Sequence, residues 1–298
     1  MKLLKKLLES SQKETLMKMA YGVTDVGKSR TMNEDYFWVN PDKNLFIVAD
    51  GMGGHNAGDV ASKNATQIVD AYLTTELLSE IRENIRKIRE TMIKSLLHAH
   101  TEILEMAEKN PDYEGMGCTI VVALIFNNSL HLGHVGDARA YLCNETGITT
   151  LTIDHSFVME LVQKGKLSIE EARISPLKNK LNQAIGASKP INPDYKHYTL
   201  KEGDKILLCS DGLWDMLTDQ EMYTVLRENH SPKKIGETLI KMANDAGGHD
   251  NITALVIQHK EQTESPTSQE PDEPDAFEKS GEYSFVFKEP SPGETTDE

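Results

Sequence analysis

Three strand-like segments follow one another with almost no chain between them, and this feature constrains the fold more than any other. They are "CTIVVALIFN", "SLHLGHVGD" and "ARAYLC", at residues 118–127, 129–137 and 138–143. A parallel return needs a crossover of a dozen or more residues, so links this short predict antiparallel hairpins. Further strands are expected at "YGVTD", "DYFWV", "LFIVADG", "DKILLCSDG" and "NITALVIQH".

Segments with helical periodicity fall in separate blocks from these strands. Apolar residues recur at spacings of three and four over residues 60–78 and 80–110, and shorter helices are expected at about 219–229 and 231–246. Because strands group with strands and helices with helices, the pattern indicates the α+β class, with antiparallel sheets covered by helices.

Length and cysteine content narrow the class of protein. The 298 residues suffice for a sizeable core, and no apolar stretch approaches the roughly 20 residues that a membrane span needs. The three cysteines, Cys118, Cys143 and Cys209, lie far apart in apolar runs. An odd number without the spacing of a metal site predicts buried thiols in a reducing compartment, and therefore a cytoplasmic protein.

The net charge of −15 is distributed unevenly. Residues 1–19 carry a balance of +3, residues 20–259 a balance of −9, and residues 260–298 a balance of −9. An acidic body argues against nucleic-acid binding, which needs a basic surface. It is compatible with carboxylates gathered around divalent cations, and equally with an ordinary solvated acidic surface.

The same composition divides the chain into three regions. Residues 1–19 predict a basic amphipathic extension, which we expect to pack on its own domain or to fray, because so few apolar residues give no stable membrane attachment. Residues 20–259 are expected to form the folded domain. Residues 260–298 are rich in proline, acids, serine and threonine and are expected to be disordered. Within them, "YSFVF" at 283–287 is either a short docking segment or a chance apolar stretch.

Aspartates recur where the predicted strands begin or end. "NLFIVADG", "HLGHVGD" and "KILLCSDG" end near aspartates, "GGHDN" precedes the last strand, and "SRTMNED" precedes "YFWV"; the residues are Asp35, Asp50, Asp137, Asp211 and Asp250. Each Asp-Gly pair taken alone is ordinary turn chemistry. If the strand ends converge, however, the carboxylates repel one another unless protons or cations neutralise them. Oxygen ligands without cysteine or histidine spacing favour Mg²⁺ or Mn²⁺.

Such a cluster suits hydrolysis of a phosphate ester. Two cations roughly 3.5–4 Å apart lower the pKa of a bridging water and bind the oxygens of the substrate. Arg30, five residues before Asp35, offers a planar fork that matches two phosphate oxygens. Taken alone, Arg30 is better explained as an exposed loop arginine.

Seven motifs in order resemble the PPM family of metal-dependent serine/threonine protein phosphatases (type 2C), and its bacterial branch in particular. They are "SRTMNED", "VADGMGGHNAGDVAS", "GCTIVV", "LHLGHVGDARAYL", "DHS", "LLCSDGLWDML" and "GGHDNIT". The similarity runs from about residue 21 to residue 257. The resemblance implies a central β-sandwich of two antiparallel sheets flanked by helices, with residues 20–259 as the catalytic domain and a mobile flap at about 154–188. In that flap, "ARISPLKNKLNQAIGAS" matches the family more loosely than "DHS" does.

The resemblance also implies roles for individual residues. Asp50 would bridge two cations, Mg²⁺ or Mn²⁺, with the Gly51 carbonyl on one of them. Asp211 and Asp250 would bind one cation directly, whereas Glu34 and Asp35 would hold the other largely through water. Asp137 and Asp211 would form a weaker third site, and Arg30 would clamp the phosphate. Some members carry a histidine as general acid directly after the Asp-Gly pair, but here this position is Met52, and the nearby His55 is as well explained by a structural hydrogen bond.

The function that follows is hydrolysis of phosphoserine and phosphothreonine in proteins by a metal-bridging hydroxide. Arg30, Asp50 and Asp211 are the expected catalytic residues, and a serine/threonine kinase with its substrates is the expected partner of a monomeric enzyme. Two alternatives stay open: a phosphatase-like binding or scaffold protein without strong activity, and a hydrolase of small phosphoesters.

Overall fold

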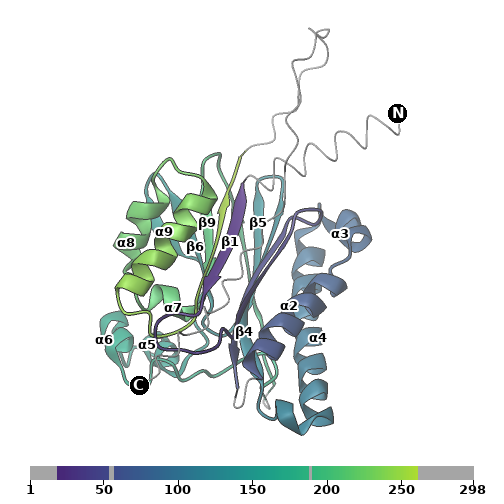
Figure 1. The fold of residues 1–298 in the computed structure, drawn as a ribbon. Coiled ribbons are helices and arrows are strands. Elements are labelled where there is room, and N and C mark those ends of the chain that lie inside the picture. Colours follow the sequence, from purple (N-terminus) through teal and green to yellow (C-terminus); the bar gives the residue numbers. More distant parts are fainter. Residues whose placement is uncertain (1–18, 54–56, 188–189, 261–298) are drawn as a thin grey trace, which may run out of the picture.

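The computed structural model describes residues 19–53, 57–187 and 190–260. In it, two antiparallel five-stranded sheets pack face to face and helices cover both outer faces, giving four layers (Figure 1). The expected fold class is confirmed. The residues 1–18 of the N-terminal extension, His55 and the tail from residue 261 lie outside the described residues.

The first sheet has the strand order β1-β10-β9-β6-β7. Its strands are β1 (Ala20–Asp25), β10 (Ile252–Gln258), β9 (Lys205–Cys209), β6 (Arg139–Asn144) and β7 (Gly147–Thr150). The second sheet has the order β2-β3-β4-β5-β8. Its strands are β2 (Asp35–Asn40), β3 (Leu45–Met52), β4 (Gly117–Phe126), β5 (Ser129–Val135) and β8 (Asp194–Thr199).

Each sheet has its own helical layer (Figure 1). The second sheet is covered by α2 (Gly58–Tyr72) and α4 (Ile85–Lys109), with the short α3 (Thr75–Ile81) and the 3₁₀ turn η1 (Pro111–Tyr113) beside them. The first sheet is covered by α8 (Asp219–Leu226) and α9 (Pro232–Asp245), and α7 (Asp211–Trp214) lies at one end. The expected flap contains α5 (Phe157–Gln163) and α6 (Ile169–Ile174).

The central strands are apolar throughout because both of their faces are buried. On β3, Leu45 and Ile47 face the layer with α2 and α4, whereas Phe46 and Val48 face the other sheet. A separate apolar layer fills the space between the first sheet and α9, and it includes Leu239. All three cysteines are buried and unpaired, as predicted.

The hairpin prediction was right for one link and wrong for the next. Strands β4 and β5 pair antiparallel, but β5 belongs to the second sheet and β6 to the first. The chain crosses between sheets at Gly136, whose φ of +99° is in the region that favours glycine. A short link can therefore join two packed sheets, and here it places Asp137 between them.

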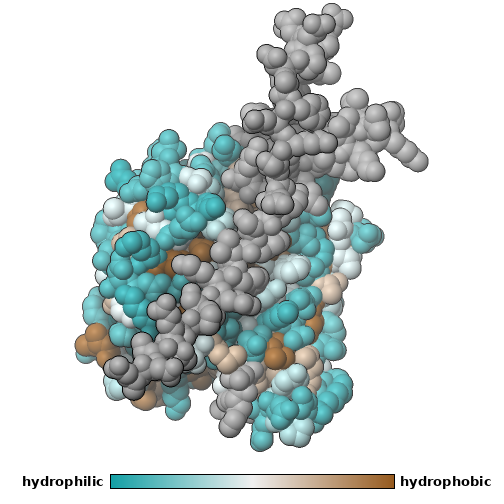
Figure 2. All heavy atoms as spheres, viewed as in Figure 1, coloured by the Kyte–Doolittle hydropathy of each residue, from teal (hydrophilic) through white to brown (hydrophobic). Residues whose placement is uncertain are grey.

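The surface in view is mostly hydrophilic, with brown groups at the lower left where α6 lies (Figures 1 and 2). Side chains of the flap contribute exposed apolar area, since Ile169, Ile174 and Leu177 are 65%, 84% and 47% exposed. Across the described ranges, every helix is too short or too polar to cross a bilayer.

Candidate active site

The acidic strand ends meet at one end of the sandwich. Asp50 on β3 lies opposite Asp35 on β2 in the antiparallel register. Asp137 lies in the crossing between β5 and β6, Asp211 begins α7 one intervening residue beyond the end of β9, and Asp250 precedes β10. A cavity of about 250 Å³ is lined by the predicted site residues Arg30, Glu34, Asp50, Gly51, Asp137, Asp211 and Asp250. Side chains from distant parts of the chain are thus brought to one site.

Glycines beside the aspartates permit close approach of neighbouring backbone. A Cβ added to Gly51 would lie 2.2 Å from the Gly58 carbonyl oxygen, and one added to Gly212 would lie 2.0 Å from the Asn251 carbonyl oxygen. Both distances are far below any real contact. These two glycines are therefore required by packing around the site, and simple turn chemistry does not explain them.

Asp35 lies behind the cavity, since it is absent from the lining and only 5% exposed. Its Oδ2 accepts hydrogen bonds from the hydroxyls of Ser210, at 2.6 Å, and Thr253, at 2.7 Å. Its Oδ1 is buried with no hydrogen-bond partner among the described residues. The sequence predicted Asp35, and Ser210 and Thr253 lie in the motifs "LLCSDGLWDML" and "GGHDNIT", but nothing in the sequence marked their contact with Asp35.

Arg30 and Glu34 occupy the rim of the cavity. The Arg30 guanidinium donates to Asp250 Oδ2 at 2.8 Å and remains half exposed. The Glu34 backbone N–H donates to the Asn251 side chain at 2.8 Å, which fixes this segment beside the start of β10. Asn251 follows Asp250 in the "HDN" motif, so its position was visible in the sequence although its role was not.

Burial and mutual repulsion raise the pKa values of the clustered carboxyls. Burial is the main cause for Asp35, whose pKa rises from 3.8 to about 7. Burial and the charge of Asp250 raise the pKa of Asp211 to about 6. Burial first, and then neighbouring aspartates, raise the pKa of Asp50 and of Asp137 well above 3.8. Without cations, these buried carboxyls are therefore harder to ionise than ordinary aspartates.

This set of donors fits hard divalent cations. The converging groups are carboxylate oxygens and a backbone carbonyl, which Mg²⁺ and Mn²⁺ prefer. The unpaired Oδ1 of Asp35 and the raised pKa values indicate a site built for positive charge that the protein side chains alone do not supply.

Further residues complete the lining of the cavity. Met52 lies in it and has no proton to donate. Thr119, Asn179 and Leu181 also line it. Asn179 and Leu181 come from the expected flap, in the part that matches the family loosely, and no spacing or composition marked them in advance.

Two cationic side chains join the expected flap to the segment around α7. Lys178 Nζ contacts both Asp215 carboxylate oxygens, at 2.5 and 2.6 Å. Arg173 on α6 donates to the carbonyl oxygens of Trp214 and Leu217, at 3.4 and 3.1 Å. The flap therefore rests against the helix that begins with Asp211.

An acidic cavity with an arginine at its rim suits cation-assisted hydrolysis of phosphate esters. Comparisons with known proteins define the class. The sequence profile of protein phosphatase 2C matches residues 9–252. The chain therefore belongs to the protein phosphatase 2C family of metal-dependent protein phosphatases, and it is a hydrolase.

Individual relatives agree with this assignment. The protein phosphatase PhpP of Streptococcus pneumoniae is 38% identical over 247 residues, which cover 81% of this chain and 98% of the relative. The S. agalactiae serine/threonine phosphatase superposes with a TM-score of 0.74 at 35% identity, covering 80% of this chain and 98% of that one. The catalytic domain of the serine/threonine protein phosphatase PstP, solved in complex with two manganese ions, gives a TM-score of 0.66 at 30% identity, covering 80% and 96%.

Proposed function

We propose that this chain hydrolyses phosphoserine and phosphothreonine in proteins. The observation that carries the proposal is that Asp50, Asp137, Asp211 and Asp250 line a single cavity together with Arg30. The names of the relatives as serine/threonine phosphatases support the choice of substrate. Retention of every predicted carboxylate argues against a binding or scaffold protein that has lost its chemistry.

We propose Mg²⁺ or Mn²⁺ as the cofactor, with two principal sites and a weaker third. Asp50 would be shared by the two principal cations and the Gly51 carbonyl would bind one of them, with Asp211 and Asp250 on one cation and Glu34 and Asp35 holding the other largely through water. Asp137 and Asp211 would hold the third. The raised pKa values of the buried aspartates support this assignment, as does the PstP domain with two manganese ions. When bound, the cations would activate the attacking water and offset charge on the phosphoryl oxygens.

The protein groups would orient the phosphate. Arg30 lies at the rim with its guanidinium half exposed, so it is free to turn a planar pair of N–H donors toward two phosphate oxygens. Asp250, which accepts from Arg30 at 2.8 Å, would limit the directions in which that guanidinium points. Met52 provides no general acid, and Thr119 and Asn179 are the neutral polar side chains that line the cavity.

We also propose that the protein acts in the cytoplasm as a monomer on substrates of a serine/threonine kinase. Three unpaired, buried cysteines are consistent with a reducing compartment. Light scattering of the purified protein would report its mass directly, and a dimer would contradict this part of the proposal.

The deciding experiment measures phosphate release from a phosphothreonine peptide with EDTA, and again after Mn²⁺ is restored. We expect turnover only with the cation, and little turnover of a phosphotyrosine peptide or of small phosphate metabolites. Asp211→Ala should abolish turnover while the far-ultraviolet circular dichroism is unchanged, and Asp112→Ala, on the exposed turn η1, should behave as wild type. Substantial Mn²⁺-dependent turnover by Asp211→Ala would contradict the assignment.

A further inference from the structure

The link between β5 and β6 (residues 136–138), which contains Asp137, forms hydrogen bonds with groups from other segments. Trp214, in α7, donates its indole N–H to the Asp137 carbonyl oxygen at 3.1 Å. His155 donates its backbone N–H to the Gly136 carbonyl oxygen at 2.9 Å. The Gly136 N–H in turn donates to His155 Nδ1 at 3.2 Å. The position of this link is thus set by residues outside it.

Arg139, at the end of the link, connects these groups to the start of the flap. Its Nε and Nη2 donate to the two carboxylate oxygens of Asp154 at 2.9 and 2.7 Å, and its Nη1 donates to the Tyr141 hydroxyl at 3.1 Å. Its guanidinium also stacks on Trp214, with Cζ 3.6 Å from the ring centroid. The side chains of Arg139 and Asp154 are only 18% and 7% exposed, so this pair is shielded from solvent, unlike an ordinary surface ion pair.

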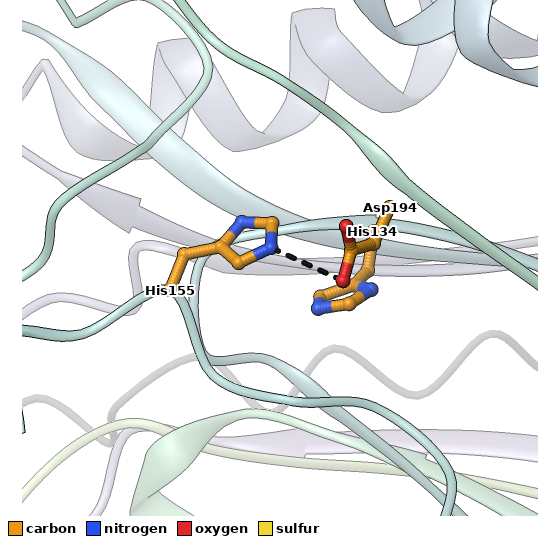
Figure 3. Close-up of side chains that lie close together, drawn as sticks. All are labelled: His134, His155 and Asp194. Carbon is orange, nitrogen blue, oxygen red and sulfur yellow. Dashed lines mark ion pairs between the residues drawn. The ribbon is translucent and has the colours of Figure 1, made fainter. Parts of the chain in front are cut away.

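His155 is fixed in one orientation by its neighbours (Figure 3). Its Nε2 faces Asp194 Oδ2 at 3.6 Å, and its ring stacks on His134 with centroids 4.6 Å apart. Because Nδ1 accepts from Gly136, the proton of the neutral ring is on Nε2 and points toward Asp194. Ligand atoms of His134, His155 and Asp194 lie within 4.8 Å of one another, but that proton occupies the direction a cation would need.

We propose that Asp154 and His155, the first residues of the flap, are positioning residues for Asp137, acting through Arg139 and Gly136. They would set the affinity of the cation site formed by Asp137 and Asp211. A change at Asp154 or His155 would therefore alter cation binding at that site. This inference rests on the proposed function. Its physical basis is that groups which contact a cation-binding residue, without touching the cation, hold that residue in the geometry the cation needs. Loss of such groups typically weakens cation binding about 10- to 100-fold.

Arg139→Lys provides the first test. Lysine keeps the positive charge but cannot form the bidentate hydrogen bonds to Asp154 or stack on Trp214. In calorimetric Mn²⁺ titrations of the full chain, we expect the weakest class of sites to bind about 10- to 100-fold less tightly, with the tighter sites unchanged. The KM for a phosphothreonine peptide should stay the same, and tryptophan emission should shift because Trp214, one of only two tryptophans, loses its partner. Arg86→Lys, in an exposed pair with Glu90 on α4, is the matched control.

A second pair of variants guards against misfolding at Arg139. His155→Ala removes the acceptor for the Gly136 N–H, whereas His155→Asn supplies a side-chain oxygen near the position of Nδ1. We expect weakened binding at the third site in the first variant and substantial rescue in the second. Wild-type Mn²⁺ isotherms in folded Arg139→Lys and His155→Ala, or an equal loss at every site, would overturn the inference. Failure of the proposed function would look different, because wild type itself would then lack Mn²⁺-dependent turnover.

Discussion

The buried aspartates at the candidate active site oppose the usual rule that charges avoid the interior. Asp35 is 5% exposed, and within the described ranges its carboxylate accepts hydrogen bonds from two hydroxyls through one oxygen. Burial and neighbouring carboxylates also raise the pKa values of Asp50 and Asp211, so full ionisation of the cluster is unfavourable when no cation is present. Each of these residues costs stability unless something positive binds, so stability and cation binding should be linked.

That linkage gives a pH prediction for the cation-free protein. The pKa of Asp35 is 3.8 at its ordinary value and about 7 when folded. Below pH 4 both states hold the proton, but between pH 4 and 7 only the folded state does, so this carboxyl contributes a stability that is lost as pH rises. In the pH range where only the folded state holds that proton, the free energy of unfolding falls by about 1.4 kcal/mol per pH unit. In EDTA, urea unfolding should therefore show Asp35→Asn to be more stable than wild type at pH 7.5, with a gap that narrows toward pH 5.

Mn²⁺ provides the control for this prediction. Because the cation replaces the protons, it should stabilise wild type at pH 7.5 more than it stabilises Asp35→Asn. If Asp35→Asn were instead less stable than wild type at pH 7.5 in EDTA, the raised pKa of Asp35 would be the wrong description of the site.

Arg30 should matter for substrate binding and little for stability. Its guanidinium is half exposed, and its ion pair with Asp250 lies at the surface, where such pairs contribute about 0–1 kcal/mol. Arg30→Ala should reduce kcat/KM for a phosphothreonine peptide by about 10- to 100-fold, because a charge-assisted pair of hydrogen bonds to phosphate is lost. The thermal midpoint should change little. Arg82→Ala, an exposed arginine beside α3, should leave both quantities unchanged.

At the scale of the element, the observed helix boundaries differ from those expected from apolar periodicity at positions where side chains cap helices. The pattern over residues 60–78 was one segment, but α2 ends at Tyr72, and Thr74 begins α3 by accepting a hydrogen bond from Leu77 N–H. Likewise α4 begins after Asn84, whose side chain accepts from Lys87 N–H. These local hydrogen bonds stop and restart helices without interrupting the apolar stripe, so periodicity alone did not reveal the breaks.

The packing of α9 on the first sheet should be needed for stability but not for chemistry. Leu239 is fully buried between this helix and the sheet. Leu239→Ala should lower the free energy of unfolding by about 2–5 kcal/mol, through lost burial and the cavity left behind. Phosphate release at 25 °C per folded molecule should be unchanged. Lys234→Ala, on the exposed face of α9, should alter neither property, and a loss of turnover in folded Leu239→Ala would show that α9 acts on the site.

At the scale of the whole molecule, the cavity is assembled from both sheets and the flap. Asp50 comes from the second sheet, Asp211 and Asp250 adjoin strands of the first, and Asn179 comes from the flap. The site therefore exists only when the two sheets are packed together. All of these described parts lie within residues 30–250.

Removal of residues 260–298 should consequently spare basal turnover. We expect wild-type rates on p-nitrophenyl phosphate with Mn²⁺, and the same requirement for the cation. Effects on phosphoprotein substrates would then identify a role of the tail in recognition. Loss of turnover on the small substrate would contradict the prediction that the tail is an appendage to the catalytic domain.

Much of this protein was determined by its sequence alone. Strand-like runs with short links, and helical periodicity in separate blocks, predicted the α+β class. The ordered motifs then implied the sandwich of two antiparallel sheets. They also predicted Arg30, Glu34, Asp50, Asp137, Asp211 and Asp250, which now line one cavity. These features were accessible because each depends on a local pattern, such as burial on a strand or a glycine next to an acid.

Only the tertiary structure decided the rest. It showed that the link after β5 crosses between sheets, that Asp35 lies behind the cavity with Ser210 and Thr253, and that Asn179 and Leu181 reach the cavity from the flap. It also joined Arg139, Asp154 and Trp214 into one cluster. The physical reason is that these contacts pair residues far apart in the chain, and their partners are set by how two sheets and a flap pack, which no local spacing encodes.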